Sequence, residues 1–273
     1  MSRTRLLKRI ATWTAVVLAV LIPGRVRAQD DAYNAPRNAV VNAAGARVIN
    51  VEAGAGFLRI NGRPGLTQVR VTGVAHASSR RILDAITLLA ERRGDVVTIK
   101  MVVPEGMSSF WDHFGRYSQS LDLTIDVPVG TPLNVTDGSG DATIMGTGPV
   151  DITDGSGNLE VAGITGKVDI TDGSGNVTIR GVDGDVHIDD GSGNIDANNV
   201  TGNFTIGADG SGSVDITGVG GTMRIDAKGS GPVTVSRVGG DFIVESKGSG
   251  NIDYNTVKGS VSIPERRRRS RRG

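Results

Sequence analysis

Apolar and polar residues alternate in short runs from about residue 134 to residue 263, and the runs recur at a nearly fixed spacing. Alternation with a period of two is typical of β-strands, whose successive side chains point to opposite faces. A Gly-Ser-Gly turn separates the runs. Its second glycine falls at Gly140, Gly157, Gly175, Gly193, Gly212, Gly231 and Gly250, with spacings of 17, 18, 18, 19, 19 and 19 residues. The chain therefore contains seven copies of one short unit.

Aligning the copies places aliphatic residues in three columns. One column precedes the turn, as in Val168 and Ile170, and a second follows it, as in Val177 and Ile179. The third lies at a corner after a glycine or small residue, and comprises Ile164, Val182, Val200, Val219, Val238 and Val257. In the last copy, Ile252, Tyr254, Val261 and Ile263 continue the first two columns.

Each unit holds two short strands, which cannot enclose a core alone, so the apolar columns must be buried between neighbouring units. Antiparallel hairpins would pair unlike columns, whereas parallel coils place Val on Val and Ile on Ile. We therefore predict an all-β fold, a right-handed parallel β-solenoid of about seven coils of 18–19 residues. At about 4.8 Å per coil the rod would be roughly 34 Å long.

Residues 29–133 form an irregular β-rich module before the repeats. "GFLRINGRPG", residues 56–65, matches a regular copy glycine for glycine and predicts a degenerate first coil. Ser78 or Ser79 is positioned to cap a short helix that ends near Ile86, followed by a hairpin that turns at "ERRGD". A longer helix that ends at Arg93 is the alternative. A strand from Leu121 to Val127 then leads into the repeats.

Residues 1–28 have the features of a secretory signal peptide. A basic start precedes an apolar run from Ile10 to Ile22, which is shorter than the roughly 20 residues that span a bilayer. Removing this segment removes six of the 30 basic residues and no acidic residue, which leaves a net charge of −5. The chain has no cysteine, which excludes disulfides and a thiol-linked lipid anchor. We expect an exported protein, periplasmic or at the cell surface, without a transmembrane segment after cleavage.

Two segments are candidate contact sites for a partner. The first is an aromatic cluster in a polar stretch before the repeats, formed by Phe110, Trp111, Phe114 and Tyr117. The second is an Arg-rich C-terminal tail, residues 264–273, which contains Arg266, Arg267, Arg268, Arg269, Arg271 and Arg272. Such a tail suits a polyanion, although export makes nucleic acid an unexpected partner. We expect the tail to be disordered and solvated, and the alternative for the aromatic cluster is a cap on the solenoid.

An aspartate directly precedes five of the seven turns, and a lysine precedes the last two. The aspartates form the column Asp137, Asp154, Asp172, Asp190 and Asp209, and the lysines are Lys228 and Lys247. We expect these aspartates at the solvent-exposed edge, where each caps its own turn. In water, two such charges about 4.8 Å apart repel by only about 0.9 kcal/mol, so a bound metal is permitted but not required. A calcium β-roll is disfavoured because Val177 and Val186 stand where that repeat has its aspartate ligand.

The sequence does not predict a catalytic site or a cofactor. The histidines are His76, His113 and His187, and none has a visible catalytic partner. Asp189 and Asp190 are adjacent, so in a strand they would point to opposite faces. We therefore predict no enzymatic activity, with a glycan-active β-helix enzyme as the alternative.

The residues "VPVGTPLNVTDGSGD" and "DGSGNVTIRGVDGDV" resemble a bacterial family of exported, adhesin-like β-strand-repeat proteins of unknown function, relatives of the "putative autotransporter-adhesin head domain". The resemblance covers roughly residues 48–263 and implies a parallel β-helical fold and a cell-envelope setting. Together with the residue patterns, it predicts a non-enzymatic envelope-binding or scaffold protein whose partner is a polyanion, a glycan or a protein. A weak calcium-binding repeat protein is a further alternative.

Overall fold

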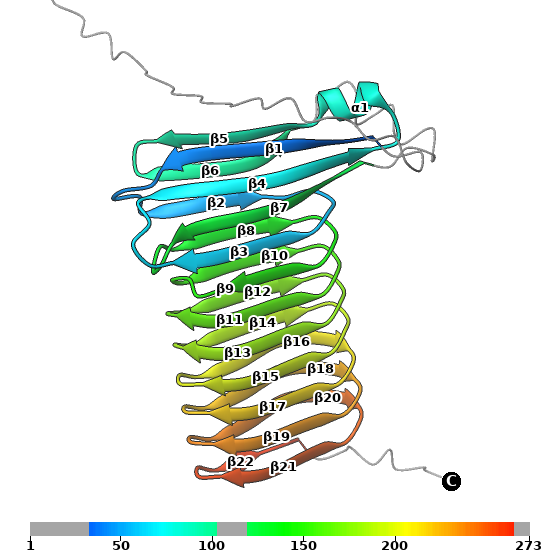
Figure 1. The fold of residues 1–273 in the computed structure, drawn as a ribbon. Coiled ribbons are helices and arrows are strands. Elements are labelled where there is room, and N and C mark those ends of the chain that lie inside the picture. Colours follow the sequence, from blue (N-terminus) through cyan, green and yellow to red (C-terminus); the bar gives the residue numbers. More distant parts are fainter. Residues whose placement is uncertain (1–32, 103–118, 265–273) are drawn as a thin grey trace, which may run out of the picture.

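The computed structural model describes residues 33–102 and 119–264, which form two long β-sheets wound into a single stack of coils (Figure 1). Each sheet contains eleven strands, and successive coils contribute one strand to each. The one helix of this part of the chain, α1 (Arg80–Ala85), has six residues, and no described helix is long and apolar enough to cross a membrane. The predicted β-solenoid is confirmed.

The first sheet has its strands in the order β1 (Tyr33–Asn42), β4 (Gln68–Ala77), β7 (Gln119–Pro128), β3 (Leu58–Arg63), β9 (Ala142–Met145), β11 (Leu159–Thr165), β13 (Val177–Asp183), β15 (Ile195–Val200), β17 (Val214–Val219), β19 (Val233–Val238) and β21 (Ile252–Val257). The second has the order β22 (Val261–Ser262), β20 (Phe242–Ser249), β18 (Met223–Ser230), β16 (Phe204–Ser211), β14 (Val186–Asp190), β12 (Val168–Asp172), β10 (Val150–Asp154), β8 (Leu133–Asp137), β2 (Val48–Glu52), β6 (Val96–Val102) and β5 (Thr87–Arg93).

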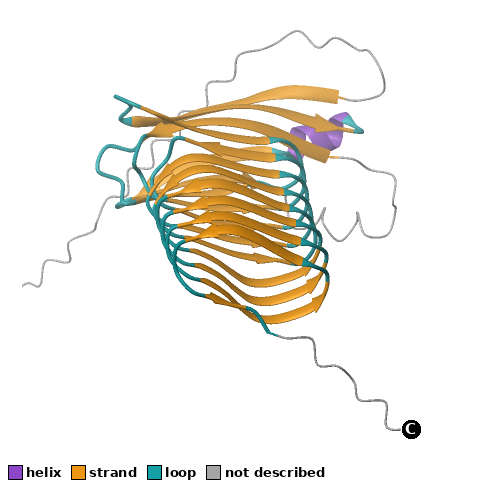
Figure 2. Cartoon of the chain, turned by 90° about the horizontal axis from the view of Figure 1, so that it is seen from below, coloured by secondary structure: helices purple, strands orange, loops and turns teal. Residues whose placement is uncertain are grey.

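From β8 and β9 onward every pairing is parallel, and it joins equivalent positions of successive repeats. Val150 pairs with Val168 and Ile152 with Ile170 in the second sheet, while Val161 pairs with Ile179 in the first. The coils therefore lie directly over one another, as the view along the stack shows (Figure 2). This register is the one that the aligned columns predict.

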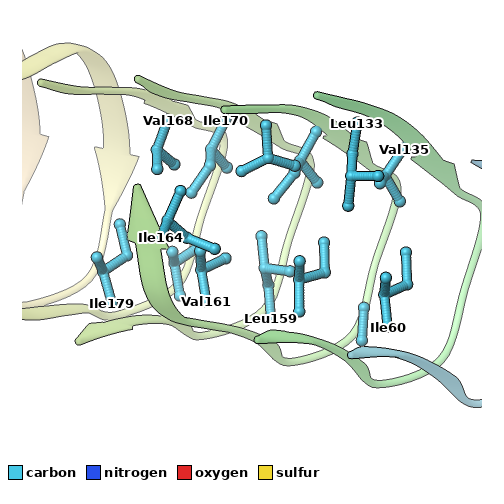
Figure 3. Close-up of a cluster of buried hydrophobic side chains, with 14 of the residues drawn as sticks. Ile60, Leu133, Val135, Leu159, Val161, Ile164, Val168, Ile170 and Ile179 are labelled. Atoms are coloured by element: carbon cyan, nitrogen blue, oxygen red, sulfur yellow. The ribbon is translucent and has the colours of Figure 1, made fainter. Parts of the chain in front are cut away.

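The aliphatic columns of the two sheets meet in the interior and form one continuous core (Figure 3). Val168 and Ile170 of one sheet lie opposite Val161 and Ile179 of the other, and the corner residue Ile164 lies between them. The final coil departs from the prediction. Tyr254 is 49% exposed and Val261 37% exposed, because within the described residues no further coil covers β21 and β22.

The N-terminal module continues the same stack. β3 pairs in parallel with β9, and β2 pairs in parallel with β8, so the degenerate first coil is confirmed. Above it, β1, β4 and β7 pair antiparallel, as do β5 and β6, and these strands close that end. Ser79 caps α1 by accepting a hydrogen bond from the Ile82 amide, as predicted. The longer helix was wrong, since Thr87–Arg93 is strand β5.

The change from an 18-residue to a 19-residue spacing occurs at a β-bulge. β14 and β16 pair Ile188 with Ile206 and then Asp189 with Ala208, so Gly207 is the additional residue. Asp189 Oδ1 accepts a hydrogen bond from the Ala208 amide at 2.8 Å and thereby fixes the bulge. The following coils keep the extra position, where Asp226 and Glu245 both pair with Arg224.

The turn glycines are required by close stacking of the backbone as well as by their dihedral angles. Gly193 has φ +146°, and a Cβ there would lie 1.4 Å from the carbonyl oxygen of Gly175 in the preceding coil. Gly181, at a corner, has φ +66° but no atom within 4 Å of the position of a Cβ. The two glycines therefore separate the effect of stacking from that of backbone conformation.

Gly193→Ala should destabilise the protein by roughly 3 kcal/mol or more, because the added methyl forces two coils apart. Gly181→Ala is the matched control, and it should cost only about 1 kcal/mol, the usual penalty for a left-handed alanine. Chemical denaturation monitored by circular dichroism measures both. Equal losses in the two variants would show that coil stacking does not restrict the turn.

Candidate functional site

The predicted contact residues lie outside the part of the chain that the structure describes. This applies to the aromatic cluster Phe110, Trp111, Phe114 and Tyr117, and to the tail arginines Arg266, Arg267, Arg268, Arg269, Arg271 and Arg272. It applies equally to the predicted signal peptide and to His113. These predictions therefore stay predictions, and the candidate site is built from residues 33–102 and 119–264.

The aspartate column is buried, which corrects the expectation that it lies at the exposed edge. The side chains that form it are only 2–4% exposed, and they are Asp137, Asp154, Asp172, Asp190, Asp209 and Lys228. The cause is the strand alternation itself. In β10, Val150 and Ile152 point inward, and two residues later Asp154 points the same way. Sequence reasoning missed the column, although the alternation that predicted the core carried the signal.

Three of the five column aspartates, Asp137, Asp154 and Asp190, accept a hydrogen bond from their own turn through one carboxylate oxygen. Asp154 Oδ1 accepts from the Ser156 amide at 3.2 Å, and Asp190 Oδ1 accepts from the Ser192 amide at 2.9 Å. The predicted turn-capping role is therefore confirmed for these three aspartates and not for Asp172 or Asp209. However, the other oxygen, Oδ2, of Asp137, Asp154 and Asp190 has no protein partner, and neither does either oxygen of Asp172. A buried carboxylate without partners is costly to keep ionised.

Burial is the main cause of a raised pKa throughout the column. Burial and then the charge of Asp154 raise the pKa of Asp137 to about 7 and that of Asp172 to about 6. Burial, followed by the charges of Asp172 and Asp209, raises the pKa of Asp190 to about 6. The pKa of Asp154 is also raised by burial, with a smaller contribution from Asp141. The column therefore takes up protons near neutral pH.

Lys228 ends the buried column with a positive charge. Its Nζ lies 2.9 Å from Asp209 Oδ2 and donates hydrogen bonds to the carbonyl oxygens of Gly212, at 2.9 Å, and Ser230. Burial raises the pKa of Asp209, while the ammonium group of Lys228 lowers it. In the next coil Lys247 is only half-buried. The buried part of the column thus contains five carboxylates and one fixed cation.

Two histidines lie beside aspartates on the outer surface. His76 Nε2 is 3.1 Å from Asp122 Oδ2, a pair that joins β4 and β7 and that the sequence did not reveal. His187 Nε2 is 3.5 Å from Asp189 Oδ2. Asp189 and Asp190 point to opposite sides of β14, and the buried Asp190 is out of reach of a polysaccharide. These two carboxylates therefore do not form the pair that a glycan-active enzyme would use.

No group of three or more His, Cys, Asp or Glu side chains is arranged to hold a metal ion anywhere in residues 33–102 and 119–264. The column carboxylates follow one another along the stack instead of converging on one point. Any ion between two coils would therefore be held by at most two carboxylates together with backbone oxygens.

The column should make the protein less stable as pH rises. The folded-state pKa values of Asp137, Asp172 and Asp190 lie above the unfolded value, so the folded state holds more protons between about pH 4 and pH 7. We expect the free energy of unfolding to fall by about 2 kcal/mol or more between pH 5 and pH 8. Urea denaturation at a series of pH values measures the change.

The control for this experiment is the double variant Asp172→Asn/Asp190→Asn, which keeps an acceptor for the Ser192 amide but cannot ionise. It should be less sensitive to pH than the wild type, whereas Asp215→Asn, at an exposed position, should behave as the wild type does. A wild-type free energy of unfolding that does not change from pH 5 to pH 8 would contradict the assignment of buried carboxyl groups with raised pKa values.

Lys228→Met should lower the free energy of unfolding at neutral pH by about 3 kcal/mol, because it leaves the Asp209 carboxylate buried without its cation. The double variant Lys228→Met/Asp209→Asn should recover much of the loss, since no charge then remains to be compensated. Thermal denaturation of the four proteins completes the cycle. Additive losses would show that the two side chains are not coupled.

Comparisons with known proteins found only distant similarities, all of them to solved structures. No family model matches, and no curated protein matches. Three solved structures match over 84% of this chain. They are described as a "putative adhesin" from Bacteroides fragilis (15% identity, TM-score 0.47, 96% of that chain), a "putative lipid binding protein" from Parabacteroides distasonis (14%, 0.39, 97%) and a "putative cell adhesion protein" from Clostridium sporogenes (13%, 0.33, 99%). Because identity and structural overlap are this low, the matches do not indicate what this chain binds.

Proposed function

We propose that this chain is an exported, non-enzymatic scaffold that binds a component of the cell envelope. In this proposal residues 1–28 direct export, residues 29–133 close one end of the rod, and residues 134–263 form its length. Residues 264–273 and the aromatic cluster around Trp111 contact the partner. The observation that carries the scaffold part is the hydrogen-bonded polar surface of the stack.

The polar side chains at one corner bond to one another along the rod. Asn158 Nδ2 donates to Asp141 Oδ1 at 3.0 Å, Asn176 Nδ2 donates to Asn158 Oδ1 at 2.9 Å, and Asn194 Nδ2 continues the ladder to Asn176 at 2.9 Å. Ser213 Oγ donates to Asn194 Oδ1 and extends it by one more coil. Groups that are fixed in this way stiffen the stack and have little remaining capacity for acid–base chemistry.

A basic groove supports contact with a polyanion. It has a volume of about 680 Å³ and runs along the corner of the last coils, where its charged lining residues are Arg237 and Lys258 and no acidic residue contributes. The predicted Arg-rich tail follows the same end of the chain. The two together would place positive charge at one end of an otherwise acidic rod, which favours binding to phosphate-bearing envelope polymers.

Deleting residues 264–273 should lower retention on isolated envelopes or on lipopolysaccharide by about tenfold or more, with the loss greatest at low salt. The reason is that the six arginines release counterions from the polyanion. The probe is sedimentation with envelope fractions at several salt concentrations. Replacing all six arginines with lysine is the matched control, and it should keep most of the retention if charge is the cause.

Trp111→Ala tests the aromatic contribution, with Trp111→Phe as its control, in the same sedimentation assay. If the tailless protein and Trp111→Ala were both retained as well as the wild type, envelope binding would be wrong and only the scaffold role would remain. Release of soluble sugars from a polysaccharide by the purified protein would contradict the non-enzymatic assignment.

A further inference from the structure

The environment of Lys228 shows what the space inside the turn column accepts. Three oxygens surround its ammonium group: Asp209 Oδ2 and the Gly212 carbonyl from one coil, and the Ser230 carbonyl from the next. All three are hard oxygen ligands, and the group between them is a cation. The turns of two successive coils thus form an oxygen-lined position that is closed to solvent.

The same arrangement recurs in the coils above, but without the lysine. Between the coils of Asp172 and Asp190, the equivalent groups are the Asp172 carboxylate, the Gly175 carbonyl and the Ser192 carbonyl, and Asp190 takes the position of Lys228. Asp172 is fully buried there, and neither of its carboxylate oxygens has a protein partner. Asp209 thus has a positive charge beside it, from Lys228, whereas Asp172 has a second negative charge beside it, from Asp190.

The spacing of the coils suits a calcium ion. Parallel strands lie about 4.8 Å apart, so an ion midway between two coils would lie about 2.4 Å from the level of each carboxylate, within the 2.3–2.6 Å range of calcium–oxygen bonds. Calcium also accepts backbone carbonyls and irregular ligand sets, whereas magnesium demands a near-ideal octahedron. Two carboxylates would balance the charge of one divalent ion.

We propose that the interior of the turn column, between the coils of Asp137 and Asp209, binds calcium ions, each held by its own pair of successive carboxylates such as Asp172 and Asp190, and that Lys228 is the protein's own cation at the end of this column. The negative charge of the column aspartates is then neutralised by protons at acidic pH and by calcium at alkaline pH. Groups facing the column are its own carboxylates, Lys228, the half-buried Lys247 and, next to Asp154, the surface residue Asp141. This inference is independent of envelope binding.

Isothermal titration with calcium chloride at about pH 8, together with thermal denaturation, tests the proposal. The wild type should bind calcium, and millimolar calcium should raise its melting temperature by at least about 5 °C. At about pH 5 both effects should disappear, because protons then occupy the carboxylates. Choline chloride at equal ionic strength separates binding from screening, and magnesium should be less effective.

The double variant Asp172→Asn/Asp190→Asn should lose most of the calcium response while remaining folded, since both substitutions keep the side-chain size and Asp190→Asn can still accept from the Ser192 amide. Asp215→Asn/Asp253→Asn, at exposed positions, is the matched control and should respond as the wild type does. A wild type that shows the pH effect but no calcium effect would overturn the proposal in favour of protons alone. An undiminished response in Asp172→Asn/Asp190→Asn would place the calcium elsewhere and would also overturn it.

Discussion

Parallel hydrogen bonding between equivalent positions of successive coils is the constraint on which the rest of this molecule depends. It places Val150 over Val168 and Ile152 over Ile170, and so turns a repeated sequence into continuous aliphatic columns. The same register brings the turns so close together that only glycine fits at positions such as Gly193. It also forces identical polar residues into contact, whether that contact is favourable, as in the Asn158–Asn176 ladder, or costly, as in the aspartates.

The regular part of the fold could be predicted because the repeat supplies many aligned copies of each position. The degenerate coil around Leu58 and Ile60 was found for the same reason, and the short helix after Ser79 through its capping residue. The antiparallel pairing of β1 with β4 and of β4 with β7 could not be found in this way, because those strands have no counterpart in the repeat.

The aspartate column shows how one rule can hide another. Asp154 follows Val150 and Ile152 at the strand period, which indicates an inward side chain, but a carboxylate before a glycine turn also suits the surface. The sequence analysis predicted a surface position for these aspartates, whereas in the structure their side chains point inward. The missed His76–Asp122 pair has a different cause, because it depends on the register between two irregular strands.

The two ends of the stack are unlike. Antiparallel strands and α1 close the N-terminal end, where the Arg37 guanidinium also donates to the carbonyl oxygens of Leu83 and Ile86. At the other end, Tyr254 lies against Phe242, with their ring centroids 5.9 Å apart, and is itself half-exposed. Within residues 33–102 and 119–264, the apolar columns are thus covered at the N-terminal end of the stack and reach solvent at the other end.

The bulge at Gly207 has a consequence for how such a rod can change in length. Where a coil with the extra residue meets one without it, a bulge is needed to restore the alignment, whereas two coils that both carry the residue pair without a register shift. Asp226 and Glu245 show that the extra residue persists down the chain. A coil of the same length as its neighbour needs no bulge, so an in-frame duplicate of an existing coil is the simplest way to lengthen such a rod.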